Sequence, residues 1–120
     1  MSYFYIVLTI LLTVYGQIAI KWQVLKAGAL PEPLPEKISF MLHLLLNPWI
    51  ISALLAAFLA SFFWMAAMTK LQLSHAYPFM GLTFVLILLA SGFFFQEPVT
   101  TLKIVGVTLI VLGLAVASQG

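Results

Sequence analysis

Trp49–Met68, with the sequence WIISALLAAFLASFFWMAAM, is the stretch that decides the fold. It contains no charged residue, and two serine hydroxyls are the most polar groups on its side chains. A helix over these residues would be about 30 Å long, which matches the hydrocarbon core of a bilayer. The stretch therefore predicts a transmembrane helix.

The rest of the 120-residue chain has the same character. Charged residues make up 7% of it, against roughly 25% in soluble domains, and 64% of its residues are hydrophobic. A water-soluble monomer is therefore excluded. The five lysines and three glutamates leave four uncharged stretches, each long enough or nearly long enough to span a bilayer: 1–20, 38–69, 71–96 and 104–120. We predict an all-α integral membrane protein with four transmembrane helices. We expect a dimer, because four short spans leave little room for a solute pathway.

Helix breakers set the expected boundaries within a single domain over residues 1–120. Gly28 and the prolines that follow it favour a loop after the first helix, and Asn47-Pro48 breaks the long second stretch. Pro78 is tolerated in the opening turn of the third helix, whereas Glu97-Pro98 stops it. We expect transmembrane helices over about 3–25, 49–68, 76–96 and 101–118, and a loop with a short interfacial helix over 26–47.

The residue types that the chain lacks exclude several chemistries. Without cysteine it has no thiol ligands or disulfides, and without aspartate it has no Ser-His-Asp triad. Its two histidines cannot form a metal site alone. The lysines cluster at helix ends, where they interact with lipid headgroups rather than nucleic acid. We expect a binder or transporter, not an enzyme, with no metal and no cofactor. We do not expect the first apolar run to be a cleaved signal peptide, because no basic residue precedes it.

A polar stripe runs along the first expected helix. Thr13, Gln17 and Lys21 are spaced four residues apart and so share one face, with Gly16 on a neighbouring row. A lysine near the membrane margin costs a few kcal/mol unless it reaches the interface or finds an anion. One interpretation is an anion-binding site in which Gln17 supports Lys21. The other is a lysine that snorkels to the interface, and the residues alone leave both open.

Four further polar residues are candidates for contact with a substrate. Tyr77 opens the third expected helix, Thr83 lies further along it, and His75 stands at its start. Rings at the end of a span are also typical of interfacial anchors, so this alternative stays open for Tyr77 and His75. Glu97 is a substrate contact, the partner of a lysine on another helix, or a solvated cap at the interface.

Small residues form a stripe on the last expected helix. Gly106 and Gly113 are seven residues apart, and Ala117 lies close to the same face. Small side chains let transmembrane helices approach closely. We expect this face to pack against another helix, either within the protomer or at a dimer interface.

Motifs in three of the expected helices match a family pattern. They are Gly16-Gln17 with Lys21, Ala76-Tyr77-Pro78 with Leu82, Phe84 and Val85, and Glu97-Pro98-Val99 followed by Gly106, Leu109, Ile110 and Gly113. In these residues the chain resembles the four-span members of the drug/metabolite transporter superfamily. These are the small multidrug resistance proteins and, more closely, the small subunits of the aminoarabinose-phosphoundecaprenol flippase.

One departure separates these two branches. The proton-coupled multidrug exporters use a membrane-embedded glutamate in the first helix, which binds protons or cationic drugs. Here no acidic residue precedes Glu32, and Thr13 lies near the position of that glutamate. The first helix offers the cation Lys21 instead, and the natural partner of a cation is a phosphate. The resemblance therefore implies a flippase that moves a polyprenyl-phosphate-linked sugar across the bacterial inner membrane for envelope or lipopolysaccharide modification.

The resemblance also implies roles and partners. The lipid phosphate would dock at Lys21 and Gln17, and the sugar would pass Thr13, Tyr77, Thr83 and His75. The expected partners are this glycolipid, membrane lipids, and either a second copy of the chain or a homologous four-span subunit.

Glu97 distinguishes the flippase from its two alternatives. In the flippase it would meet an amino group of the sugar. In a multidrug exporter it would be the coupling carboxylate, and aromatic rings would bind quaternary cations. In a non-transport accessory subunit, both Lys21 and Glu97 would be dispensable, and the glycines of the last helix would matter.

Overall fold

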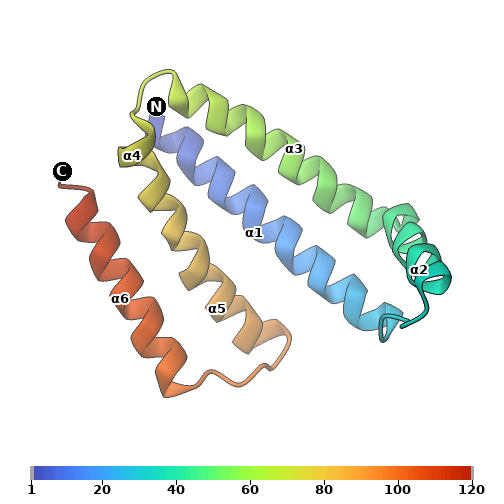
Figure 1. The fold of residues 1–120 in the computed structure, drawn as a ribbon. Helices are drawn as coiled ribbons and strands as arrows, with labels where there is room; N and C mark the ends of the chain where they lie inside the picture. The colour runs from blue at the N-terminus through green and yellow to red at the C-terminus, as the bar shows by residue number, and fades with distance from the viewer. Residues whose placement is uncertain (1, 120) are drawn as a thin grey trace.

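The computed structural model describes residues 2–119, and all the regular secondary structure in that range is helical. Met1 and Gly120, the ends of the expected domain, lie outside the described residues. The elements are α1 (Ser2–Ala27), α2 (Leu34–Leu46), α3 (Pro48–Met68), α4 (Leu73–Ala76), the 3-10 helix η1 (Tyr77–Gly81), α5 (Leu82–Phe94) and α6 (Thr101–Ala117). Figure 1 shows α1, α3, α5 and α6 running between two ends of the molecule, with α2 at one of these ends. The all-helical prediction is confirmed.

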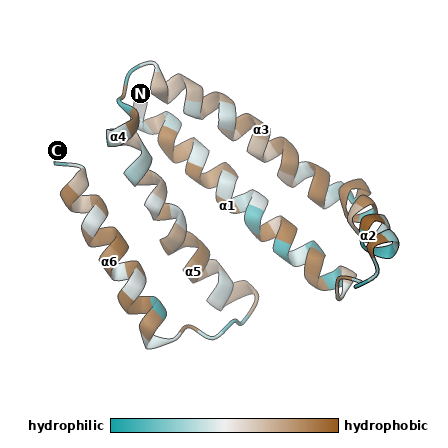
Figure 2. Cartoon of the chain, in the orientation of Figure 1, coloured by the Kyte–Doolittle hydropathy of each residue, from teal (hydrophilic) through white to brown (hydrophobic). Residues whose placement is uncertain are grey.

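The helices have the length and the surface of membrane spans. Three segments are long and apolar enough to cross a membrane, Tyr3–Ala27, Pro48–Met68 and Leu73–Phe94. The shorter α6 has 17 residues, which is the lower end of the spanning range. Figure 2 shows hydrophobic residues along α1, α3, α5 and α6. Many of their large apolar side chains are exposed, with Phe93 exposed at 79% and Leu102 at 82%. Such a surface fits a lipid solvent, and the chain is a multi-pass membrane protein.

The closest packing in the bundle joins α1 and α3, which lie side by side (Figure 1). Ala53, Ala56 and Ala60 are buried on one face of α3, at the three- and four-residue spacing of a helix. A Cβ atom added at Gly16 of α1 would lie 3.3 Å from the carbonyl oxygen of Ala53. Small residues on both helices therefore allow the two backbones to approach closely.

The segment between α1 and α3 contains more helix than we expected. Of the three prolines that predicted a loop, Pro31 lies in the loop before α2, Pro33 is the N-cap of α2, and Pro35 lies in its first turn. Proline is tolerated there because the first amides of a helix have no intrahelical partner. Among the described residues, α2 buries none, and Figure 1 shows it nearly end-on, so that its axis runs across those of α1 and α3.

Two side-chain contacts fix the junction between α2 and α3 against α1. Asn47 caps α3, because its Oδ1 accepts from the Trp49 amide at 2.8 Å, and its Nδ2 donates to Oε1 of Gln23 at 2.9 Å. Gln23 is buried on α1. Trp22 and Trp49 pack edge to face at 5.3 Å, and the Lys26 ammonium lies 4.2 Å from the Trp22 ring centre. Tryptophans of this kind mark the level of the membrane interface.

Asn47→Ala should destabilise this junction. The substitution removes the cap of α3, which contributes about 1 kcal/mol, and leaves the Gln23 side chain without its partner, which costs about 1 kcal/mol more. Thermal unfolding in detergent should show the loss. Asn47→Ser retains an acceptor for the Trp49 amide but is too short to reach Gln23, so it should lose about half as much. Equal stability of the alanine variant and the native chain would contradict this assignment.

The third span differs from the continuous helix that we expected over about 76–96. It begins earlier, at Leu73, and passes through η1 before α5 starts at Leu82. Pro78 lies within η1, where its missing amide and its ring interrupt the α-helical bonding. The helix also ends earlier, at Phe94, because Gln96 takes a left-handed backbone conformation with φ of 52°.

Candidate functional site

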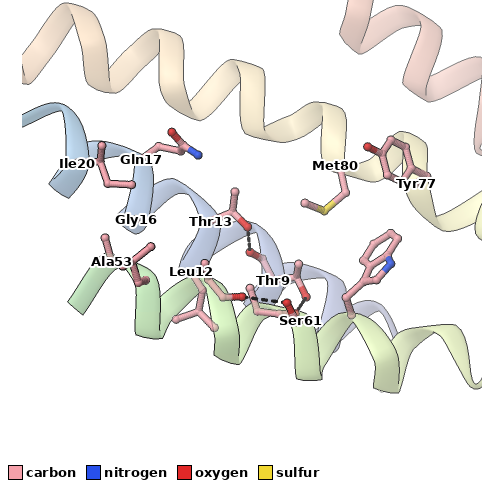
Figure 3. Close-up of a pocket in the computed structure, with 14 residues that line it drawn as sticks. Thr9, Leu12, Thr13, Gly16, Gln17, Ile20, Ala53, Ser61, Tyr77 and Met80 are labelled. Carbon is pink, nitrogen blue, oxygen red and sulfur yellow. Dashed lines mark hydrogen bonds between the residues drawn. The ribbon is translucent and has the colours of Figure 1, made fainter. Parts of the chain in front are cut away.

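A cavity of about 360 Å³ lies beside the polar stripe of α1, between α1, α3 and η1. Thr13 and Gln17 come from α1, Ser61 and Trp64 from α3, and Tyr77 from η1. Figure 3 shows Thr13 and Gln17 on α1, between the ribbon that carries Ser61 and the one that carries Tyr77. The other lining residues are mostly apolar, so the cavity offers surfaces to both a polar group and a hydrocarbon chain.

Several hydroxyls at this cavity already donate to the backbone. The Oγ1 of Thr13 donates to the Thr9 carbonyl at 2.7 Å, and the Oγ of Ser61 donates to a carbonyl of its own helix at 3.1 Å (Figure 3). A hydroxyl that has donated its one proton can only accept. The Gln17 amide and the Tyr77 hydroxyl are not engaged in this way by the described residues, so they are the donors that a ligand would meet here.

A second cavity, of about 270 Å³, lies on the side of the stripe that faces α5. Thr13 and Gln17 line it from α1, and Thr83, Phe84 and Ile87 line it from α5. The Oγ1 of Thr83 is buried and has no hydrogen-bond partner among the described residues. Because an unpaired buried hydroxyl is costly, Thr83 is a polar group that a ligand in this cavity would satisfy.

A third cavity, of about 240 Å³, contains the charged end of the stripe. Gln17 and Lys21 line it from α1, Ser91 from α5, and Glu97 from the loop that follows. The Lys21 Nζ lies 3.7 Å from the Glu97 Oε1, and the two side chains are 48% and 38% exposed. Gln17 lines all three cavities, so they are neighbours around the polar stripe, and together they are called the groove below.

The end of α5 places Glu97 against α1. The amides of Phe95 and Glu97 both donate to the Ser91 carbonyl, at 3.2 and 3.1 Å. The left-handed Gln96 between them turns the chain back. The sequence left the partner of Glu97 open, and the structure pairs it with Lys21 of the same chain.

His75 lies apart from this groove. Its Nε2 is 3.0 Å from the hydroxyl of Tyr3, and its ring packs edge to face on Phe79. This cluster lies at the end of the bundle that holds the start of α1, whereas Lys21 lies near the other end of that helix (Figure 1). The structure thus brings together Thr13, Gln17, Lys21, Thr83 and Glu97, with Tyr77 at the far side of the groove, but not His75.

The small residues of α6 do not pack against the rest of the chain. A Cβ atom added at Gly106 or Gly113 would meet nothing within 4 Å, and Ala117 is exposed. No residue of α6 is buried among those described. Packing of this stripe within the protomer therefore has no support, and its role at an interface stays a prediction.

Sequence reasoning missed several residues that line the groove. Ser61 and Trp64 face the stripe from α3, and Ser61 carried a usable signal as one of only two serines in an apolar span. Lys103 and Ser91 line a further cavity of about 380 Å³ with Glu97 and Gly106. The Lys103 Nζ donates to the Pro98 carbonyl at 3.1 Å, a contact that sequence spacing alone does not indicate.

Comparison with known proteins gives the family. No protein-family model matches the chain, and no solved structure matches it either. A relative from Serratia proteamaculans (strain 568) is 35% identical over 117 residues, which cover 98% of this chain and 95% of the relative. One from Pseudomonas aeruginosa (strain LESB58) is 33% identical over 116 residues, which cover 92% and 91%. Both are described as the probable 4-amino-4-deoxy-L-arabinose-phosphoundecaprenol flippase subunit ArnE. With identity at this level over nearly its whole length, the chain belongs to the ArnE family of flippase subunits.

Proposed function

We propose that this protein is a subunit of a transporter that flips a polyprenyl-phosphate-linked aminosugar across the bacterial inner membrane. The observation that carries the proposal is Lys21, a cation at the end of a polar stripe that joins three cavities. The names of the relatives supply the substrate class, an aminosugar joined through phosphate to undecaprenol.

In the proposed mechanism, the lipid phosphate docks at Lys21 and Gln17 while the isoprenoid tail stays in the bilayer. A charge-assisted hydrogen bond from an ammonium to a phosphate oxygen is about twice as strong as a neutral one. The sugar then moves along the groove, where the Gln17 amide and the Tyr77 hydroxyl donate and Thr83 gains a partner. The head thus exchanges its contacts with water for contacts with protein, which lowers the cost of crossing the hydrocarbon core.

The exposed α6 supports a dimer as the working unit. Gly113 and Ala117 of its small-residue face are exposed and offer a surface for a helix from a second copy or from a homologous four-span subunit, while Gly106 lines the cavity between α5 and α6. The cavities also open outwards from a single chain, so a second subunit would complete their walls. This arrangement makes the groove a shared pathway.

A multidrug exporter is the second candidate, with Glu97 as its coupling carboxylate. The 3.7 Å pairing with Lys21 argues against it, because a carboxylate that already faces an ammonium attracts a cationic drug less strongly.

A non-transport accessory subunit is the third candidate. It requires neither charge, so it is an outcome of the same experiment.

Lys21→Gln should remove the phosphate contact. We expect the protein, purified in mild detergent and studied by native mass spectrometry, to retain polyprenyl phosphate at least tenfold less than the native chain. Lys26→Gln is the matched control, because it removes a charge of the same sign from α1 where the ammonium lies over the Trp22 ring. Bulk phospholipid alone, unchanged by the Lys21 substitution, would overturn the proposal.

A further inference from the structure

The pairing of Lys21 with Glu97 adds a function that neither residue has alone. We propose that this ion pair is a charge-exchange lock that selects heads carrying both a phosphodiester and a primary ammonium group. The phosphodiester of the ligand pairs with Lys21 and the ammonium group of the ligand pairs with Glu97, so the Lys21 and Glu97 side chains separate from each other. This inference rests on the proposed function and specifies which lipid-linked heads the site accepts.

The geometry describes a pair that opens easily. At 3.7 Å the Lys21 Nζ and the Glu97 Oε1 are farther apart than the atoms of a typical hydrogen bond. The two side chains are 48% and 38% exposed, and ion pairs of this exposure hold weakly because solvent screens them. The backbone of Glu97 is held at the end of α5 by the bond from its amide to the Ser91 carbonyl, but its side chain extends from the loop and can rotate away from Lys21 without disturbing a span.

There is space for a head on both sides of Glu97. The cavity of about 240 Å³ lies between it and Lys21 of α1, and the cavity of about 380 Å³ lies between α5 and α6. Ser91 and Glu97 line both. When the pair separates, the two cavities become neighbouring parts of one site, with the cation on one wall and the carboxylate between them.

Charge balance then makes the site selective. A head with one phosphate charge and one ammonium charge replaces each partner of the pair with an equivalent one. A head with the phosphate alone satisfies Lys21 but leaves Glu97 without a counter-ion and close to the new negative charge. Glu97 is therefore a specificity-determining residue, which acts mainly by weakening the binding of heads that carry a phosphate but no ammonium group.

Lys103 is a second cation near the Glu97 carboxylate, so it is an alternative partner for Glu97 when Lys21 binds a phosphate. It lines the cavity beyond Glu97, and its Nζ is held by the Pro98 carbonyl at 3.1 Å. If Glu97 simply moved to Lys103 when a phosphate arrived, a head without an amino group would carry no penalty. The lock requires that the amino group of the ligand take Glu97 instead.

The test measures the affinity of the purified protein in mild detergent for two probes. One is a polyprenyl-phosphate-linked aminosugar, and the other is the same lipid with its amine acetylated. The native chain should bind the free amine about tenfold more tightly. Glu97→Gln should reduce this ratio to near one, by weakening the amine form and strengthening the acetylated form. Glu36→Gln, which removes a carboxylate from α2, is the matched control and should leave the ratio unchanged.

A charge reversal separates the lock from a structural role for the pair. Lys21→Glu/Glu97→Lys keeps an ion pair at the same place, so a purely structural contact would retain both folding and lipid binding. The lock predicts normal thermal unfolding but a loss of binding of about tenfold or more. The phosphate lies next to the isoprenoid tail and the amine lies beyond it, so in the reversed variant the phosphate would face a carboxylate and the amine would face an ammonium group. Native affinity in the reversed variant would overturn the inference.

The outcomes distinguish failure of the inference from failure of the proposed function. Equal affinity of the native chain for both probes, still dependent on Lys21, would overturn the lock alone. Binding of neither probe, or binding independent of Lys21, would overturn both. Phosphatidylethanolamine carries the same two charges without a sugar and serves as the third probe. We expect it to bind more weakly, and affinity equal to that of the aminosugar lipid would overturn the proposed function.

Discussion

Thr13→Glu should weaken binding of a polyprenyl phosphate by about a hundredfold and give the protein affinity for lipophilic cations. Thr13 lines the groove on both the α3 side and the α5 side, one turn from Gln17. At an effective dielectric constant of about 20, a carboxylate about 6 Å from the phosphate opposes it by roughly 3 kcal/mol, or about a hundredfold in affinity. The substitution places an anion near the point where the multidrug branch carries its glutamate.

The measurement compares dissociation constants for a polyprenyl phosphate and for tetraphenylphosphonium, in alkaline buffer so that the new carboxyl group is ionised. Thr13→Gln adds similar bulk without charge, and it should weaken phosphate binding much less than the glutamate does. If the glutamate variant bound the phosphate as tightly as the glutamine variant, the groove would not be the path of the anionic head.

Gly16→Leu should have the largest effect on stability. A Cβ atom at this position would lie 3.3 Å from the Ala53 carbonyl oxygen, closer than ordinary van der Waals contact, so a leucine would force the backbones of α1 and α3 apart. Overpacking of this kind typically costs 1–3 kcal/mol. Because α1 and α3 form the most extensive helix contact, we expect about 3 kcal/mol and a large fall in the yield of folded protein.

Unfolding in a denaturing detergent, followed by circular dichroism, measures this loss. Gly113→Leu is the matched control, because a Cβ atom there meets nothing within 4 Å. It should leave unfolding of the single chain unchanged and weaken self-association or association with a partner subunit. If the two variants unfolded alike, close approach of α1 and α3 would not be a main source of stability.

The sequence predicted the helical spans because their signal is local. Trp49–Met68 needs only its apolar run and the Asn47-Pro48 break to be recognised, and α3 begins at Pro48. The boundaries near proline were less accurate. The sequence around Pro35 indicated a loop, whereas the structure places this residue in the first turn of α2. Pro78 was compatible with a regular α-helix, whereas the structure places it in the 3-10 helix η1.

The site could be predicted only where its residues share one element. The stripe of Thr13, Gln17 and Lys21 follows from a four-residue spacing on α1, and the structure places cavities along it. The partner of Lys21 could not be found in this way, because Glu97 is far away in sequence and reaches α1 through the left-handed turn at Gln96. His75 stays a prediction as a substrate contact, because its ring lies against Tyr3 and Phe79 and it does not line the three cavities along the stripe.

The pair of tryptophans at the end of α1 has a consequence for how a lipid arrives. Trp22 and Trp49 pack together at 5.3 Å, and Lys21 precedes the first of them in the chain, so we expect the ammonium to lie near the phosphates of one leaflet. If the lipid phosphate docks at Lys21, as we propose, a polyprenyl phosphate reaches the protein by diffusing sideways in the membrane plane, without first leaving or entering the bilayer. The rate of capture then depends on the number of these lipids per unit area of that leaflet.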